Sequence, residues 1–419
     1  MNRNLRLLGV GVGIRMFGNA MYAPFIALFL YNVLHVAYVE IGIIIAGIGA
    51  VQVPFNFLGG LVADRVSRRR LILVGLACEA AATAALAYAF SIRSLELAIV
   101  TSLVGGVLTT LAAPASSAYI ADFAEGTERT RGFTFYRIGF NAGYSAGVTF
   151  GGVLVGVVGF AGAVALASIV IAVGAAFLAV LLADSPRDVR ATTAAPLPTP
   201  DGPTPSPSAG APRRSMRSSL AILARDRPAL ELLIAVALAA LLLGQWSITF
   251  PLYVHNVLGI SYALLGAGLA LNGLVVVFGQ SATTERVVGM RHTVIANLGT
   301  GLYVLAFLGL GVAGLLGAFP TIAFFAAVVV LTVGENLVTI PQATLPSNLA
   351  PREELGAYNG AFNMVGGFGF LAAVLLGGLV LSLTANPLLI WVLLVTPAVP
   401  AILLFRHART HLSLEVDRA

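Results

Sequence analysis

The chain has 419 residues, of which 58% are hydrophobic and only 10% are charged. An ordinary soluble domain carries about 25% charged residues, so this composition excludes a soluble globular fold and predicts a chain embedded in lipid. The net charge of +6 does not indicate nucleic-acid binding, because the arginines lie at predicted helix ends and in one linker. The sequence has no lysine, which excludes a phosphate-binding loop of the Gly-x-x-x-x-Gly-Lys type, and its single cysteine excludes an intrachain disulfide.

Twelve apolar segments follow one another, each long enough for a membrane-spanning helix of about 20 residues. In chain order they lie near residues 7–33, 37–62, 71–91, 95–121, 132–157, 160–183, 229–254, 261–284, 293–315, 320–346, 356–382 and 388–405. We therefore predict an all-α integral membrane protein with two six-helix bundles, 1–183 and 229–405. Residues 184–228 form a linker that is rich in proline, serine and glycine, and residues 406–419 form a tail.

Arginine placement predicts the topology. Of the 24 arginines, 21 lie in the N-terminal segment, the linker, the C-terminus and the connections after the second, fourth, eighth and tenth spans. Only Arg93 lies in a connection on the other side, while Arg15 and Arg137 lie inside predicted helices. The positive-inside rule then predicts that both termini and the linker are cytoplasmic.

The two halves share residues at a constant spacing. Residues 32–34 (Asn-Val-Leu), Tyr38 and Gly42 recur 224 positions later as residues 256–258 (Asn-Val-Leu), Tyr262 and Gly266. At the same spacing, Gly132 and Gly143 recur as Gly356 and Gly367. This pattern predicts an internal repeat of six helices in the same sense.

Residues 59–70, GGLVADRVSRRR, join the second and third spans. This stretch resembles the signature loop of the major facilitator superfamily, Gly-x-Leu-Ala-Asp-Arg-x-Gly-Arg-Arg/Lys. The matching residues are Gly60, Ala63, Asp64, Arg65, Arg68 and Arg69, whereas Val62 and Ser67 depart from the pattern. The resemblance implies a twelve-helix secondary transporter that works by alternating access, with its substrate site near the midplane between the halves.

The same resemblance implies a cytoplasmic latch that also involves Asp122, at the end of the fourth span. In the family, an acid at this position pairs with an arginine of the signature loop, so Arg65, Arg68 and Arg131 are its expected partners. Alternatively, these residues are solvated helix-end charges that contribute about 0–1 kcal/mol per pair.

Four charged residues lie well inside predicted spans, away from the span ends, where a charge costs at least about 2.5–3.5 kcal/mol. At a rise of about 1.5 Å per residue, Arg15, Glu79 and Arg137 lie at one depth, so an acid–base cluster is possible. Arg15 then either holds an anionic cargo or forms a structural ion pair. Glu79 is either a second proton-coupling acid or a neutralised packing contact, and Arg137 is either a cavity residue or a side chain that reaches back to water.

Glu335 lies deeper, with no arginine at its own level, which makes it the first candidate for carrying a proton. The local pattern Gly334-Glu335-Asn336 followed by Pro341 resembles that of twelve-helix multidrug/proton antiporters. In those proteins, the acid takes part in proton coupling or in binding cationic drugs. The alternative is a neutral glutamic acid that is hydrogen bonded to a neighbouring helix.

Glycines in the fifth span have a spacing similar to the antiporter signature Gly-x-x-x-Gly-Pro-x-x-Gly-Gly, but Val148 replaces the proline. Close helix packing is the alternative explanation. Polar and aromatic residues of the predicted cavity complete the candidate site: Asn19, Tyr22, Gln52, Asn141, Tyr144, Gln245, Trp246, Asn272, Asn336 and Asn363.

From these features we expect proton-coupled export of a small amphipathic or cationic compound, with aromatic contacts from Tyr22, Tyr144 and Trp246. Uptake or exchange of a small anion or metabolite held by Arg15 is the second hypothesis, and a receptor that no longer transports is the third. We expect no enzymatic activity, no metal and no cofactor other than a proton gradient. A monomer in the plasma membrane is the expected form.

Overall fold

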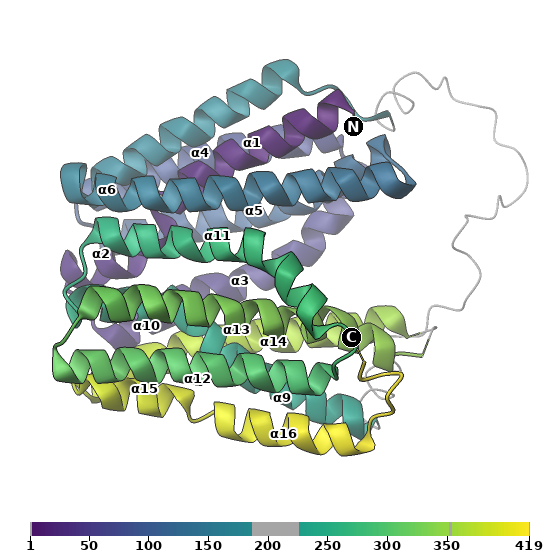
Figure 1. Ribbon diagram of the computed structural model, residues 1–419. Helices are drawn as coiled ribbons and strands as arrows, with labels where there is room; N and C mark the ends of the chain where they lie inside the picture. Colours follow the sequence, from purple (N-terminus) through teal and green to yellow (C-terminus); the bar gives the residue numbers. More distant parts are fainter. Residues whose placement is uncertain (1, 187–225, 352–353, 419) are drawn as a thin grey trace, which may run out of the picture. The chain divides into compact units, whose positions relative to one another are not determined.

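The computed structural model describes residues 2–186, 226–351 and 354–418, and almost all of them are helical (Figure 1). Up to the predicted linker, the helices are α1 (Arg3–Ala20), η1 (Ala23–Phe25), α2 (Ile26–Asn32), α3 (Tyr38–Arg65), α4 (Arg68–Ser91), α5 (Leu95–Phe123) and α6 (Gly126–Leu181). After it come α9 (Arg227–Leu243), η2 (Gly244–Ser247), α10 (Thr249–Asn256), α11 (Tyr262–Val287), α12 (His292–Leu316), α13 (Pro320–Leu349), α14 (Leu355–Leu383), α15 (Pro387–Val395) and α16 (Ala398–His411).

The described residues supply the twelve spans that the sequence predicts. By length and hydropathy, eleven helical stretches of the described residues are able to cross a membrane, and one of them has 54 residues, Glu128–Leu181. A straight helix of that length would extend about 81 Å, far beyond a hydrocarbon core of about 30 Å. Gly159 breaks it with a φ of 73°, and Figure 1 shows the chain turning back within α6. The stretch therefore supplies two spans.

Polar side chains fix the starts of several helices. Asn2, Ser67, Ser94, Asp226 and Asn386 each accept a hydrogen bond from a backbone amide of the first turn that follows. These caps satisfy amides that have no partner within their own helix. The connection in the signature stretch is shorter than expected, because α3 continues to Arg65 and α4 begins at Arg68 under the Ser67 cap.

The internal repeat is confirmed by the helix boundaries. The helices that begin at Arg3, Tyr38 and Arg68 have counterparts that begin at Arg227, Tyr262 and His292, each 224 positions later. The turns that follow the first span of each half are also built alike. The Val36 amide donates to the Leu30 carbonyl at 3.0 Å, and the Ile260 amide donates to the Val254 carbonyl at 3.1 Å. The repeat therefore includes backbone hydrogen bonds as well as residue types.

Left-handed residues occupy equivalent places in the two halves. His35 and Gly259, which are repeat partners, have φ values of 55° and 69°. Arg93 and Gly317 are partners as well, with φ values of 55° and 62°. The second half uses glycine, which adopts this conformation without a steric penalty, whereas the first half does not.

Contacts divide the chain into two compact units. One contains Met1–Ala195 and Ser247–Val277, and the other contains Pro196–Trp246 and Phe278–Ala419. This division assigns α10 and most of α11 to the first unit, whereas the sequence repeat assigns them to the second half. Each unit has a buried apolar core, centred on α1, α4 and α5 in the first and on α9, α14 and α16 in the second. Most of the predicted linker lies outside the described residues.

Glycines allow α6 to pack directly on the backbone of α1. A Cβ atom at Gly143, Gly147 or Gly151 would overlap the carbonyl groups of Gly13, Phe17 or Met21, respectively. These positions are one helical turn apart, so they form a continuous strip of close contact. In the structure, therefore, the glycine pattern of the fifth span packs two helices closely.

We expect Gly147→Ala to lower the stability of the purified protein by about 1–3 kcal/mol, because the added methyl group must displace the α1 backbone. Thermal unfolding in detergent measures the effect. Gly156→Ala is the matched control, since a Cβ there meets nothing within 4 Å and alanine favours the helix by up to about 1 kcal/mol. Equal unfolding midpoints for the two variants would contradict the packing argument.

Candidate functional site

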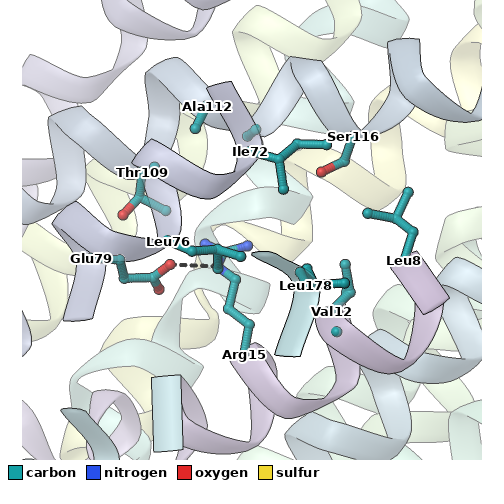
Figure 2. Close-up of a pocket in the computed structure, with 13 residues that line it drawn as sticks. Leu8, Val12, Arg15, Ile72, Leu76, Glu79, Thr109, Ala112, Ser116 and Leu178 are labelled. Atoms are coloured by element: carbon teal, nitrogen blue, oxygen red, sulfur yellow. Dashed lines mark hydrogen bonds and ion pairs between the residues drawn. The ribbon is translucent and has the colours of Figure 1, made fainter. Parts of the chain in front are cut away.

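An ion pair between α1 and α4 lies at the centre of the candidate site. Arg15 Nε donates to Glu79 Oε2 at 2.5 Å, and the Glu79 side chain is only 6% exposed (Figure 2). Both residues are inside predicted membrane spans, where an isolated charge is costly. The pair therefore lets each charge reside in the membrane, and it cancels the positive charge of Arg15.

A small cavity adjoins the ion pair. Its volume is about 30 Å³, and four helices line it: α1, α4, α5 and α6. Glu79 Oε1 is buried and accepts no hydrogen bond from the described residues, while Thr109 and Ser116 add hydroxyl groups to the lining (Figure 2). This volume is enough for about two water molecules and far below the 300–1,000 Å³ or so of a typical ligand pocket.

Tyrosine and threonine side chains extend this polar cluster along α1 and α4. Tyr22 lies within hydrogen-bonding reach of Thr83 and Asn19 and within electrostatic range of Arg15 and Glu79. The Thr83 hydroxyl donates to the Glu79 carbonyl at 2.8 Å. Two predicted cavity residues, Asn19 and Tyr22, thus lie beside the ion pair, whereas Thr83 gave no signal in the sequence.

Of the three charges for which a cluster was possible, the structure pairs Arg15 with Glu79. Arg137 is exposed on α6 and is not among the residues that line the cavity. Within the described residues, no ion pair joins it to Glu79. Equal depth in the membrane was a necessary condition for contact, but the direction of each side chain around its helix decided the outcome.

Glu335 lies on α13 in the second unit. It is half-buried, and Asn336 beside it is 1% exposed. Tyr303 of α12 lies within electrostatic range of Glu335, and its buried hydroxyl has no hydrogen-bond partner among the described residues. The spans α12, α13 and α14 contain no arginine.

Two predicted cavity residues make contacts between helices instead. Gln245 is fully buried, and its amide donates to the carbonyls of Leu241 at 2.8 Å and Ala373 at 3.1 Å. These bonds tie α9 to α14, and they give Gln245 a role in helix packing. Gln52 contacts α5, where its Oε1 accepts from the Thr110 hydroxyl at 3.5 Å. The other candidates are half-buried or exposed: Asn141, Tyr144, Trp246, Asn272 and Asn363.

The proposed latch residues are partly brought together. Arg68 Nη1 lies 2.9 Å from Asp122 Oδ1 and donates to the Ala118 carbonyl at 2.6 Å. Arg69 Nη1 lies 3.5 Å from Asp184 Oδ1, a pairing that was not predicted. The side chains of Arg65 and Arg131 are exposed. Gly60 and Asp64 are in α3 but outside the residues whose side chains the structure describes.

Each half also places an aromatic pair at the turn between its first two spans. The rings of Tyr31 and Tyr38 stack at 4.1 Å, and those of His255 and Tyr262 stack at 4.0 Å. The Asn32 amide also lies 3.4 Å from the Tyr262 hydroxyl. These residues were missed as a contact set, although Tyr31 and His255 are related by the same 224-residue spacing that relates the tyrosines.

Comparison with known proteins agrees with the twelve-span fold. Residues 8–374 match the family model described as Major Facilitator Superfamily. An uncharacterized MFS-type transporter, YttB of Bacillus subtilis (strain 168), is 25% identical over 388 residues, which cover 91% of this chain and 89% of that protein.

Solved transporter structures share the fold. A POT family transporter in complex with a thioalcohol-conjugated peptide has a TM-score of 0.73 and 15% identity, with 98% of this chain and 97% of that chain covered. The nucleoside transporter NupG has a TM-score of 0.70 and 14% identity, with 97% and 98% covered. Together with the family match over most of the sequence, these findings establish that the chain is a secondary transporter of the major facilitator superfamily.

Proposed function

We propose that the chain exports a small amphipathic or cationic compound in exchange for protons. The observation that carries this proposal is the ion pair of Arg15 with Glu79. Because Glu79 neutralises Arg15, this arginine does not offer an anionic cargo the uncompensated guanidinium that the competing hypothesis requires. With Arg15 paired, the acid Glu335 is the charged candidate that favours a cationic cargo.

Glu335 is the proposed proton carrier. Its carboxyl is half-buried within α13, which is long and apolar enough to cross a membrane. A carboxyl in such surroundings binds either a proton or a cationic cargo, and competition between the two would couple their opposite movements. Glu79 is the second candidate for this role, because one of its oxygens lies beside a cavity with room for water.

Uptake or exchange of an organic anion or metabolite is the alternative. Of the transporters with a similar fold, one is bound to a peptide conjugate and another, NupG, is a nucleoside transporter. An exposed Arg137 is the feature that such a cargo would use. The charge pairing of Arg15 makes this alternative weaker than cation export.

We propose further that the protein works as a monomer in the plasma membrane, with both termini in the cytoplasm. The arginine distribution supports this orientation. The twelve spans and the intact Arg68–Asp122 pair support a transporter that cycles, in contrast to a receptor that has lost transport.

Transport assays in inverted membrane vesicles test the proposal. With an inward-acidic proton gradient, we expect accumulation of a lipophilic cationic dye and none of a small organic anion such as benzoate. A protonophore should abolish the accumulation, and vesicles without the protein serve as the control. Gradient-driven accumulation of the anion, or of neither compound, would overturn cation export.

A further inference from the structure

The segment after α16 packs against the second unit, although the sequence predicts only a tail. Residues 412–418 return to the start of α12, where Arg418 forms an isolated antiparallel β-bridge with Arg291. Leu412 is buried, and Val416 packs against the apolar core of the second unit. The Val416 carbonyl accepts from the Asn348 amide of α13 at 3.1 Å. The segment therefore contacts the ends of both α12 and α13.

Asp417 is the main polar contact of this segment, and it is completely buried. Its Oδ1 accepts from the Thr293 amide at 2.8 Å, its Oδ2 accepts from the Thr293 hydroxyl at 2.7 Å, and its carbonyl accepts from the His292 amide at 2.6 Å. Arg291 Nη1 lies 3.9 Å from Oδ2. The carboxylate thus caps the first turn of α12, where the helix dipole favours a negative charge.

In the first half, the start of the corresponding helix, α4, is also held by charged residues, but with the charges reversed. His292 and Thr293 are the repeat partners of Arg68 and Arg69, 224 positions earlier. In the first half, these two arginines begin α4 and bind acids at the ends of α5 and α6. The second half has no arginine at either position, and an acid from outside the repeat binds the helix start instead.

We propose that residues 412–418 are an intramolecular latch required for transport, with Asp417 as its positioning residue. The latch holds the cytoplasmic ends of α12, α13 and α16 together, as the Arg68–Asp122 and Arg69–Asp184 pairs hold those of α4, α5 and α6. This role does not depend on which cargo the protein carries.

Hydrogen–deuterium exchange and transport, measured on the same variants of the full chain, test the proposal. In Asp417→Asn we expect amide exchange at residues 292–293 to rise about tenfold, since the charge-assisted hydrogen bonds are weakened. The rate of transport should fall with it. Glu415→Gln is the matched control, because Glu415 is an exposed acid on the same segment, and it should leave both readouts unchanged.

The possible outcomes distinguish whether Asp417 holds the segment in place from whether the latch is required for transport. Wild-type protection of residues 292–293 in Asp417→Asn would overturn the importance of the carboxylate. Lost protection with wild-type transport would overturn the latch as a requirement for transport. If Asp417→Asn does not fold, Thr293→Val replaces it, because it removes one donor and leaves the backbone amides; its expected effect has the same direction and a smaller size. Exchange is measured without any cargo, so failure of the proposed export function would leave this readout intact.

Discussion

Glu79→Gln is expected to be about 3–5 kcal/mol less stable than the wild type, because it leaves the guanidinium of Arg15 in the membrane without its counter-charge. Arg15→Met should be less harmful. A carboxyl left alone is able to take up a proton and become neutral, whereas a guanidinium stays charged at any accessible pH. Thermal unfolding in detergent, together with the monodisperse fraction on size exclusion, measures the difference.

The double variant Arg15→Met/Glu79→Gln completes a double-mutant cycle with the two single variants. Since it removes both charges together, it should recover most of the stability lost in Glu79→Gln. Glu285→Gln is the control, because Glu285 is exposed near the end of α11 and should change the unfolding midpoint little. A Glu79→Gln protein as stable as the wild type, or a double variant no better than the worse single one, would contradict a stabilising pair.

Glu335→Gln is expected to reduce gradient-driven accumulation of the cationic dye to the level of empty vesicles. Glutamine keeps the size and hydrogen-bonding ability of the side chain but neither binds nor releases a proton near neutral pH, so coupling is lost while folding is preserved. Exchange of labelled for unlabelled dye without a gradient should continue, because it does not require net proton movement. Comparing the two assays on the same vesicles separates coupling from cargo binding.

Glu231→Gln is the matched control for this variant. Glu231 is an acid of the second half, near the start of α9, where its Oε2 lies 3.0 Å from His407 Nδ1. It should leave accumulation unchanged. Full accumulation by Glu335→Gln would remove this residue from the coupling mechanism and make Glu79 the acid to test, whereas loss of both accumulation and exchange would indicate a role in binding the cargo.

Much of the fold was predictable because it follows from local chemistry. Apolar length alone gives the spans, and the break between the fifth and sixth was expected within one or two residues of Gly159, where the backbone turns. The constant spacing between Asn32 and Asn256 identified the repeat. The docking of residues 412–418 was not predictable in this way, since a short polar segment with a buried aspartate has no periodic signal.

The candidate site was predictable only in part. Membrane depth placed Arg15, Glu79 and Arg137 in one layer, but depth says nothing about the direction of a side chain. Only the three-dimensional structure shows that Arg15 pairs with Glu79 and that Arg137 is exposed. The Arg68–Asp122 contact followed from the family pattern, whereas Arg69–Asp184 required the three-dimensional positions of both helix ends. Gln245 was indistinguishable in sequence from a cavity residue, because burial between two helices depends on tertiary packing.

The left-handed turns occur at matching positions in the two halves and show that the repeat extends to backbone torsion angles. His35 and Arg93 each adopt a conformation that costs a residue with a Cβ atom about 1–2 kcal/mol, while glycine occupies the matching places in the other half. The turn geometry sets the angle at which one span leads into the next, and the two halves share it although the residues at these positions differ. A comparison of torsion angles between the halves would therefore reveal the internal repeat even where the residues of the two halves differ.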